Sequence, residues 1–254
     1  MPLELLETRY TTRNLKRRLG SRAERDFLEL GAMNISGWED DFQGDALIGL
    51  YQSTASGAAA AAAAISTGVV NGAILLDAGT DNAGRSDLSW GLHYQAQLNA
   101  VYIARFKINA ITTRKFEIGF TDVISGTDAG AVNVKATPSF TADNAVVLVF
   151  DTNDDTLLTL VGVKSTVAAT KSDFATVLAA DTYYYFGVAL FGDDNAKGFI
   201  LDANGAFLEE ETIEDAVTAT TLLTPWLFVQ NRAGNAGSMT VDWHRAYQRR
   251  TTTA

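Results

Sequence analysis

Histidine is the first residue type to examine for chemistry, and this chain contains only His93 and His244. Asp242 precedes His244 by two positions, so on a β-strand both side chains would point to one face and could share a metal ion or a proton. No further ligand cluster accompanies them, and Val241 and Trp243 alternate with the pair as an apolar face. We therefore expect His244 on the solvent face of a C-terminal strand and assign it no catalytic or metal role.

The sequence carries no pattern typical of an enzyme. Cysteine is absent, which excludes thiolate catalysis, thiolate metal sites and disulfides, and there is no Gly-x-Ser-x-Gly elbow. Glycoside hydrolysis needs a pair of carboxylates about 5–10 Å apart, but the acidic groups at 39–41, 151–155 and 209–215 fall in expected turns or linkers. We expect a protein that is not an enzyme, with no catalytic residue and no cofactor.

Calcium binding is the other chemistry that acidic clusters suggest. Residues 151–155 place oxygen atoms at the first, third and fifth positions of a calcium loop. Thr156 then stands where that loop needs glycine, and Gly162 stands where it needs glutamate. We assign no metal site, and a looser calcium site at Asp81-Asn82 or Asp193-Asp194 stays an alternative.

The strongest charge pattern lies at the N-terminus. Residues 1–26 hold seven basic and four acidic side chains, a net charge of +3, so the rest of a chain with net charge −10 carries −13. We expect this basic arm to anchor the chain on an acidic partner surface, the alternative being that it folds back on its own acidic body. The acidic body argues against nucleic acid as a partner. The basic residues that would bind the partner are Arg13, Lys16, Arg17, Arg18, Arg22 and Arg25.

The elements that position these groups are of two kinds. Residues 1–35 predict a short helical arm, because Ser21 to Glu24 have capping-box spacing and Gly31 is a natural stop. From 36 to 254, apolar and polar residues alternate over short runs separated by turn clusters. This pattern predicts an all-β protein, an antiparallel jelly-roll sandwich. No apolar run reaches the length of about 20 residues that a membrane-spanning helix needs.

Several segments of this region carry specific predictions. Residues 102–108 and 116–120 alternate as strands with one apolar face, and Asn204-Gly205 predicts a type I′ hairpin turn. The strand at 182–191 is apolar on both faces, so we expect a central strand whose second face is covered by its own chain or by a neighbouring subunit. The alanines at 58–64 predict a small-residue strand or loop where surfaces approach closely.

Parts of the C-terminal half resemble a known fold. Residues 181–208 look like the paired-strand unit of concanavalin A-like jelly rolls, in which a long strand is followed by a short hairpin. Segments 224–231 and 239–248 are similar to the last strands of that fold. Tailed-bacteriophage structural proteins of this kind often close with a Val-Asp-Tyr/Trp strand, which Val241-Asp242-Trp243 resembles.

The resemblance implies a virion structural protein. It would be a capsid decoration, head-fibre or tail-associated subunit, assembled in the host cytoplasm, anchored to capsid or tail proteins by its arm, and homo-oligomeric, with a trimer as the family-level expectation. The alternative is a lectin-like, carbohydrate-binding module of a receptor-binding fibre that contacts a host-surface glycan through Trp38, Trp90 and Trp226. A β-sandwich glycoside hydrolase is the third alternative, and the Glu-x-Asp-x-x-Glu motif of that branch is absent.

Overall fold

The computed structural model describes residues 35–44, 46–124, 130–136, 139–192 and 194–250. The six basic residues of the arm and the expected helix at its end lie outside the described residues. The first described strand starts at Ile35 and pairs with the last described strand. No helix in the described part of the chain is long and apolar enough to cross a membrane.

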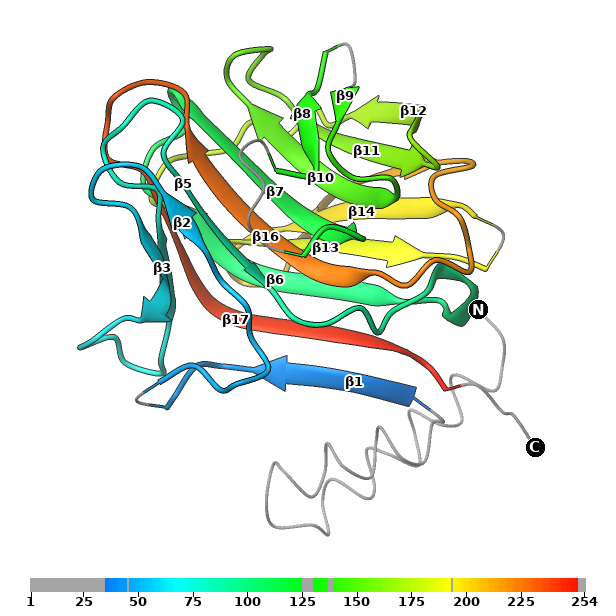
Figure 1. Ribbon diagram of the computed structural model, residues 1–254, viewed down its shortest axis with the longest axis horizontal. Coiled ribbons are helices and arrows are strands. Elements are labelled where there is room, and N and C mark those ends of the chain that lie inside the picture. The colour runs from blue at the N-terminus through cyan, green and yellow to red at the C-terminus, as the bar shows by residue number, and fades with distance from the viewer. Residues whose placement is uncertain (1–34, 45, 125–129, 137–138, 193, 251–254) are drawn as a thin grey trace, which may run out of the picture.

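Within the described residues, two antiparallel sheets stack face to face (Figure 1). Sheet A, in spatial order from one edge, contains β15 (Phe207–Ile213), β14 (Ala196–Leu201), β13 (Tyr184–Leu190), β6 (Val101–Ile108), β17 (Ser238–Arg249), β4 (Ile74–Asp77) and β3 (Ala61–Ile65), and β1 (Ile35–Asp40) also pairs with β17. Sheet B contains β12 (Val167–Asp173), β11 (Leu158–Lys164), β10 (Ala145–Asp151), β7 (Arg114–Thr121), β16 (Thr224–Asn231), β5 (Arg85–Ser89) and β2 (Ala55–Ser56). A hairpin of β8 (Val132–Val134) and β9 (Ser139–Phe140) lies apart, and η1 (Ala96–Leu98) is a short 3₁₀ turn. The predicted all-β jelly-roll sandwich is confirmed.

The main core fills the space between the sheets. Alternation in β6 sends Tyr102 and Phe106 inward, and alternation in β7 sends Phe116 and Phe120 inward to meet them. The rings of Phe106 and Phe116 pack edge to face with centroids 5.5 Å apart. Each of these buried side chains contributes about 1.5–3 kcal/mol relative to an exposed one. The predicted alternation of both strands is confirmed.

Sheet B is buried on its outer face as well. There a second cluster of valines and aromatic residues from β10, β11 and β16 packs against the segment that carries β8 and β9. Lys115 and Glu117, expected on a charged face, are fully buried beneath this segment and pair at 2.9 Å. Glu117 also accepts hydrogen bonds from the backbone N–H groups of Ala131 (2.7 Å) and Val132 (3.1 Å) and from the Trp226 indole (2.9 Å). The carboxylate thus ties the covering segment to the sheet.

The Asn204-Gly205 hairpin joins β14 to β15 as predicted, but its turn type differs. The Gly205 N–H donates to the Asp202 carbonyl at 3.0 Å, and the Asp202 N–H donates to the Ala206 carbonyl at 2.8 Å. Within the loop, Gly205 alone has a positive φ, 82°, whereas a type I′ turn needs positive φ at both central residues. The connection is therefore a three-residue loop with glycine in the left-handed position.

The acidic run Glu209–Glu211 lies in strand β15, so its expected position in a linker is wrong. Glu209 accepts hydrogen bonds from the backbone of Ala175 (2.8 Å), and Glu210 pairs with Lys197 at 2.7 Å. The strand is at the edge of sheet A, where charged side chains discourage pairing with another chain. Glu39, also expected in a turn, lies in β1.

The alanine tract forms β3 and the turn before it, as predicted for a place of close approach. Gly79 packs directly on this turn, and a Cβ atom at Gly79 would lie 2.2 Å from the Ala58 carbonyl oxygen and 2.4 Å from the Ala60 nitrogen. A side chain at Gly79 would force the two backbones apart.

The buried pair on sheet B yields a stability prediction. We expect Glu117→Ala to lower the free energy of unfolding by about 3–5 kcal/mol, because it leaves the Lys115 ammonium buried without its counter-charge. The partly exposed pair of Glu210 and Lys197 is the matched control, and Glu210→Ala should cost about 1 kcal/mol or less. Urea unfolding measures both variants, and equal losses would contradict the role assigned to Glu117.

Candidate carbohydrate-binding site

A β-bulge in β17 decides which side chains reach the outer face of sheet A. Val241 and Trp243 pair with consecutive positions of β6, so Asp242 is the extra residue. One inserted residue reverses the alternation of all side chains that follow it. Val241 therefore points into the core, Trp243 points outward and His244 is fully buried. The expectations that Trp243 shares the face of Val241 and that His244 faces solvent are both wrong.

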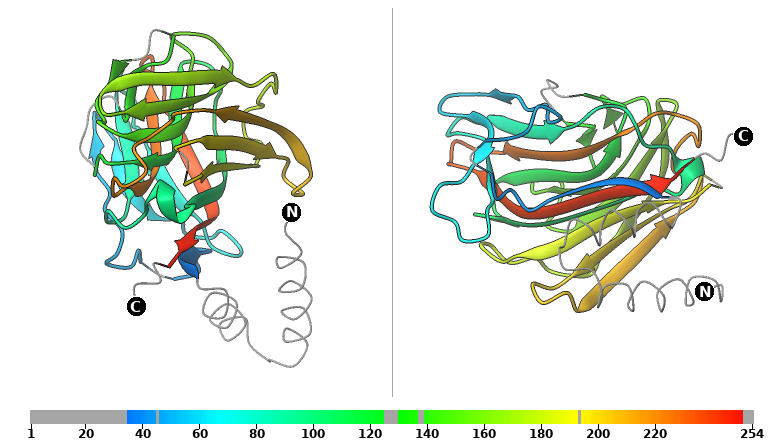
Figure 2. Two further views of the ribbon diagram at one scale, coloured as in Figure 1. Left: turned by 90° about the vertical axis from the view of Figure 1, so that its right-hand side faces the viewer. Right: turned by 90° about the horizontal axis from the view of Figure 1, so that it is seen from below.

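The bulge also coincides with a change of neighbour along β17. On the side away from β6, β17 pairs with β4 up to Val241 and with β1 from His244 onward. The loop that follows β1 and the loop that precedes β4 consequently meet beside the bulge. Figure 2 (right) looks onto this face, with β1 and β17 running side by side across it.

The two loops and the outer face of sheet A enclose a cleft of about 540 Å³. This volume falls in the range of about 300–1,000 Å³ that is typical of small-ligand sites. The floor is aromatic, and amide and charged groups stand around it. The cleft is lined by Asp41, Gln43, Val69, Val70, Asn71, Arg105, Tyr183, Tyr185, Asp242 and Trp243.

Arg105, which projects outward from β6, is held by contacts within the cleft. Its Nη1 donates to Oδ2 of Asp242 in an ion pair. Its guanidinium carbon lies 4.3 Å from the ring centre of Tyr183 and 5.6 Å from that of Tyr185, in cation–π geometry. Burial raises the pKa of Asp242, and the nearby guanidinium opposes this rise.

Trp243 is fixed in orientation from two sides. Its indole Nε1 donates to Oε1 of Glu39 at 2.8 Å, and its ring packs against Tyr185 with centroids 6.0 Å apart and an interplanar angle of 64°. Glu39 in turn lies 3.7 Å from Arg245. An aromatic ring that is already ordered loses little conformational entropy when a ligand binds.

The loop walls are anchored to the core. Phe42, between the lining residues Asp41 and Gln43, is buried and stacks on His244 with centroids 4.9 Å apart. Its N–H donates to Oδ1 of Asp40 at 2.7 Å. Gly72, with φ of 77°, packs on this loop so closely that a Cβ atom would lie 2.3 Å from the Phe42 carbonyl oxygen. The opposite walls of the cleft thus support each other.

Comparison with known proteins identifies the fold. No family model and no curated protein matches the sequence. A protein of unknown function from Shewanella oneidensis MR-1 superposes with a TM-score of 0.64 at 14% identity, covering 93% of this chain and 97% of that one. The carbohydrate recognition domain of Emp47p gives 0.55 at 13% identity (85% and 95% covered). The CBM2 module of the evolved Dit of Lactobacillus casei BL23 phage J-1 gives 0.51 at 11% identity (85% and 96% covered).

The fold is a concanavalin A-like jelly roll. The identities to these structures are low, so the likeness establishes the fold and leaves the function of this chain to its own residues. The resemblance expected from the C-terminal segments is thereby confirmed at the level of fold.

The three tryptophans expected to contact a sugar differ in their exposure to solvent. Trp38 on β1 is 37% exposed and donates its Nε1–H to the Tyr51 hydroxyl at 3.0 Å. Trp90 and Trp226 are 1% and 0% exposed, so their expected role as sugar contacts is wrong. Trp90 packs edge-on against His244 between the sheets, and Trp226 lies beneath the segment that covers sheet B.

Sequence reasoning missed the residues that do form the cleft. Tyr183 and Tyr185 lie in the strand predicted to be apolar on both faces, which was the available signal. β13 lies between β14 and β6 as expected of a central strand. Among the described residues, the outer face of β13 is covered by side chains of neighbouring strands and not by a loop. The Phe199 ring lies over Gly187, and Arg105 lies over Tyr183 and Tyr185.

The expected loose calcium positions have protein partners. Asp81 accepts the Ala58 N–H at 2.5 Å, and Asp194 pairs with Lys164 at 2.6 Å. In the part of the chain that the structure describes, no group of three His, Asp or Glu side chains is arranged to hold a metal ion. Asp193 lies outside the described residues.

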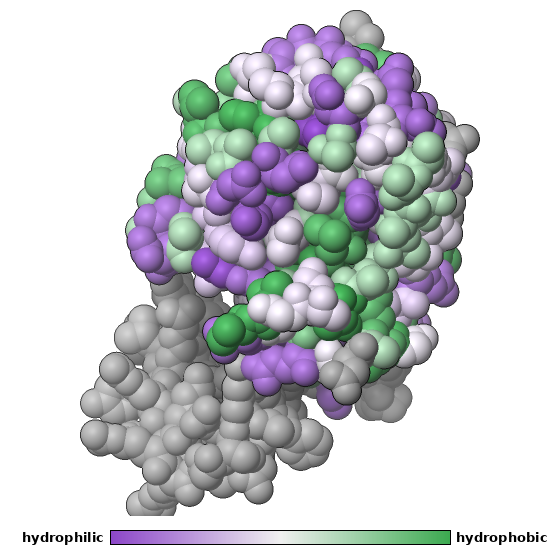
Figure 3. All heavy atoms as spheres, turned by 90° about the vertical axis from the view of Figure 1, so that its left-hand side faces the viewer, coloured by the Kyte–Doolittle hydropathy of each residue, from purple (hydrophilic) through white to green (hydrophobic). Residues whose placement is uncertain are grey.

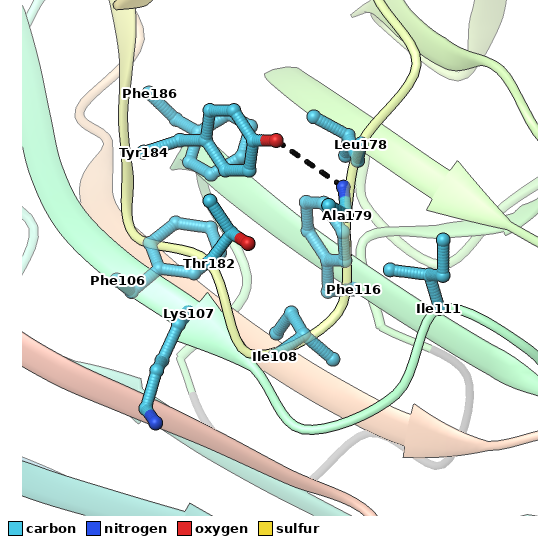
Figure 4. Close-up of a pocket in the computed structure, with 10 residues that line it drawn as sticks. All are labelled: Phe106, Lys107, Ile108, Ile111, Phe116, Leu178, Ala179, Thr182, Tyr184 and Phe186. Atoms are coloured by element: carbon cyan, nitrogen blue, oxygen red, sulfur yellow. Dashed lines mark hydrogen bonds between the residues drawn. The ribbon is translucent and has the colours of Figure 1, made fainter. Parts of the chain in front are cut away.

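A second pocket is too small to be a binding site. It lies under the loop at 178–182 and has a volume of about 10 Å³, which is barely enough to hold one water molecule (Figure 4). Its walls are mainly apolar, and the Tyr184 hydroxyl accepts the Ala179 N–H across it at 3.2 Å. On the face shown in Figure 3, hydrophobic side chains form small groups among hydrophilic ones rather than one broad patch.

His244 belongs to a buried hydrogen-bond network behind the cleft. The Tyr51 hydroxyl donates to Oδ2 of Asp40 at 2.8 Å and lies 2.7 Å from Nε2 of His244. Because this hydroxyl has given its hydrogen to Asp40, we assign the imidazole proton to Nε2. Full burial lowers the pKa of His244 to about 3.

The depressed pKa predicts a pH dependence of stability. In the unfolded chain His244 is protonated below pH 6.5, whereas in the folded chain it stays neutral down to about pH 3. The contribution of the neutral His244 to the free energy of unfolding is complete above pH 6.5. Below that value we expect the free energy of unfolding to fall by about 1 kcal/mol per pH unit. Urea unfolding between pH 7.5 and 5, above the range in which most carboxylates titrate, measures the slope.

The control for this experiment is the other histidine. His244→Phe should flatten the slope between pH 6.5 and 5, and His93→Gln should retain it because His93 is exposed. An unchanged slope in His244→Phe would assign the pH dependence to other groups.

Proposed function

We propose that this chain is a carbohydrate-binding module that holds a glycan in the cleft on the outer face of sheet A. The observation that carries the proposal is the aromatic floor formed by Tyr183, Tyr185 and Trp243 beside amide and carboxylate groups. Tyr185 lies in β13, Trp243 lies in β17, and Tyr183 immediately precedes β13. All three are therefore held by a rigid sheet. The site is therefore formed before a ligand arrives.

Sugars match such a surface chemically. One face of a pyranose ring presents C–H groups, which are attracted to the negative face of an aromatic ring, while its edge presents hydroxyl groups. Apolar walls with a few placed polar groups are the common design of small-ligand sites. In this cleft Asp41, Gln43 and Asn71 can exchange hydrogen bonds with the hydroxyl edge.

The comparisons support the proposal. A carbohydrate recognition domain, a CBM2 module from a phage protein, peanut lectin and the lectin-like defense protein arcelin-5 share the jelly roll with this chain. Fold likeness alone does not assign a ligand, so the cleft supplies the specific argument. We propose binding without hydrolysis, because the Asp242 carboxylate is committed to Arg105.

A virion role is the second proposal, and the phage Dit module favours it. In this proposal the module is a capsid-decoration, head-fibre or tail-associated subunit. Its basic arm anchors it to capsid or tail proteins, and copies associate on the particle after assembly in the host cytoplasm. Host-surface glycans are then the ligands of the cleft, so the virion role and glycan binding are compatible proposals.

Glycan binding is tested by removing the aromatic floor. We expect Trp243→Ala to weaken binding to the best ligand of a glycan array by about 10- to 100-fold, the loss typical of an aromatic residue central to an interface. Isothermal titration calorimetry measures the affinity, and circular dichroism verifies the fold of the variant.

The matched control is Phe207→Ala, which removes an exposed aromatic ring from the far edge strand β15. Its affinity should equal that of the parent protein. A blank array with the parent protein would overturn the proposed function.

The arm is tested by deleting residues 1–31, which leaves every described strand in place. We expect the truncated chain to fold with unchanged melting and to lose attachment to the particle with which the full chain copurifies. Retained attachment at normal occupancy and ionic strength would contradict anchoring, and failure to fold would assign the arm to the sandwich itself.

A further inference from the structure

The geometry of the cleft points to uncharged sugars as its ligands, with discrimination against acidic sugars such as uronates and sialates. This inference rests on the proposed function and concerns the same site. It follows from the charges that face the cleft and from how each charge is already engaged.

Carboxylates outnumber cations in the cleft. Of the described residues that line it, Asp41 and Asp242 are acidic and Arg105 is basic, which gives a formal net charge of −1. The whole chain also has a negative net charge, −10. A ligand carboxylate would enter against a repulsive potential that is strongest at low ionic strength.

The one guanidinium among these lining residues already has a carboxylate beside it. Arg105 is engaged by Asp242 through Nη1, and the faces of Tyr183 and Tyr185 lie 4.3 and 5.6 Å from its central carbon. A ligand carboxylate that used the other N–H groups of Arg105 would lie beside the half-buried carboxylate of Asp242. The repulsion between the two carboxylates would oppose the new ion pair.

Two described cations beside the cleft are paired as well. Lys107 lies 5.6 Å from the Tyr183 ring centre and pairs with Asp181 at 3.2 Å. Arg245 lies 3.7 Å from Glu39, the residue that accepts the Trp243 indole hydrogen. Each cation is thus balanced by a neighbouring carboxylate, and none is directed at the cleft alone.

The Asp41 carboxylate, which accepts a hydrogen bond from Gln43 Nε2 at 2.9 Å, has further lone pairs for hydroxyl donors. A hydrogen bond from a neutral sugar hydroxyl to a carboxylate is charge-assisted and about twice as strong as a neutral one. The carboxamides of Gln43 and Asn71 can donate and accept, so they match hydroxyl groups of either orientation. An uncharged pyranose can place the C–H face of its ring on the aromatic floor and at the same time form hydrogen bonds to the polar groups of the walls.

The experiment uses the full chain and an array that carries neutral oligosaccharides together with their uronic or sialylated counterparts. The best neutral ligand and its acidic counterpart are then titrated by calorimetry in 20 mM and 300 mM NaCl. We expect the neutral member to bind at least about tenfold more tightly in low salt. The ratio should narrow in high salt, because salt screens the repulsion.

Variants assign the discrimination to the cleft. Asp242→Asn releases Arg105 and brings the formal charge of the cleft to zero, so the acidic ligand should gain affinity relative to the neutral one by about tenfold. Asp41→Asn should change the ratio in the same direction without releasing Arg105. Glu210→Gln removes the same charge from the edge strand β15, outside the cleft, and should leave the ratio unchanged.

The outcomes separate this inference from the proposed function. Tighter binding of the acidic ligand that is lost in Trp243→Ala would overturn the inference and leave carbohydrate binding at this cleft intact. Preference for the neutral ligand that is unchanged in Asp242→Asn and Asp41→Asn would also overturn it, because the discrimination would then come from elsewhere. Binding to no member of the array would overturn the proposed function itself.

Discussion

The extra residue at Asp242 in β17 is the constraint on which the rest of sheet A depends. By reversing the alternation within the longest strand, it turns His244 into the core and Trp243 to the surface. The buried imidazole then supports Phe42, and Phe42 holds the loop that forms one wall of the cleft. A continuous strand would exchange the two positions, placing a polar imidazole in solvent and an indole among the residues between the sheets. Core, loop and binding surface therefore share one backbone irregularity.

Among the described residues, the outer face of sheet B, unlike that of sheet A, is covered by a further segment. This segment carries β8 and β9, and the covering is secured by a buried carboxylate that satisfies Lys115, two backbone N–H groups and an indole. Such a pair is costly to desolvate, so its benefit lies in complete hydrogen bonding rather than in net attraction. With that face closed, the outer face of sheet A is the sheet surface that keeps aromatic side chains within reach of solvent among the described residues.

The sequence predicted the architecture because alternation with a period of two is a local signal, and it is clear in β6, β7 and β10. It could not predict the reversal at Asp242, since a bulge depends on the register with a partner strand more than 130 residues away. The burial of Lys115, Trp90 and Trp226 was hidden for a related reason: a single strand does not reveal what will cover its polar face. The tyrosines of β13 were visible as an apolar surplus, but their meeting with Arg105 and Trp243 required the tertiary fold.

The pairing of β1 with β17 has a consequence for how the molecule is made. Ile35 lies opposite Arg249, so this strand finds its partner only after residue 249 has left the ribosome. Contacts this distant in sequence are formed late and slow the folding rate, because the entropy of closing the intervening chain must be overcome first. Until then β1 and the unpaired edge of sheet A are open to mispairing with other chains. Synthesis of this protein should therefore be sensitive to local chain crowding in a way that its final stability does not reveal.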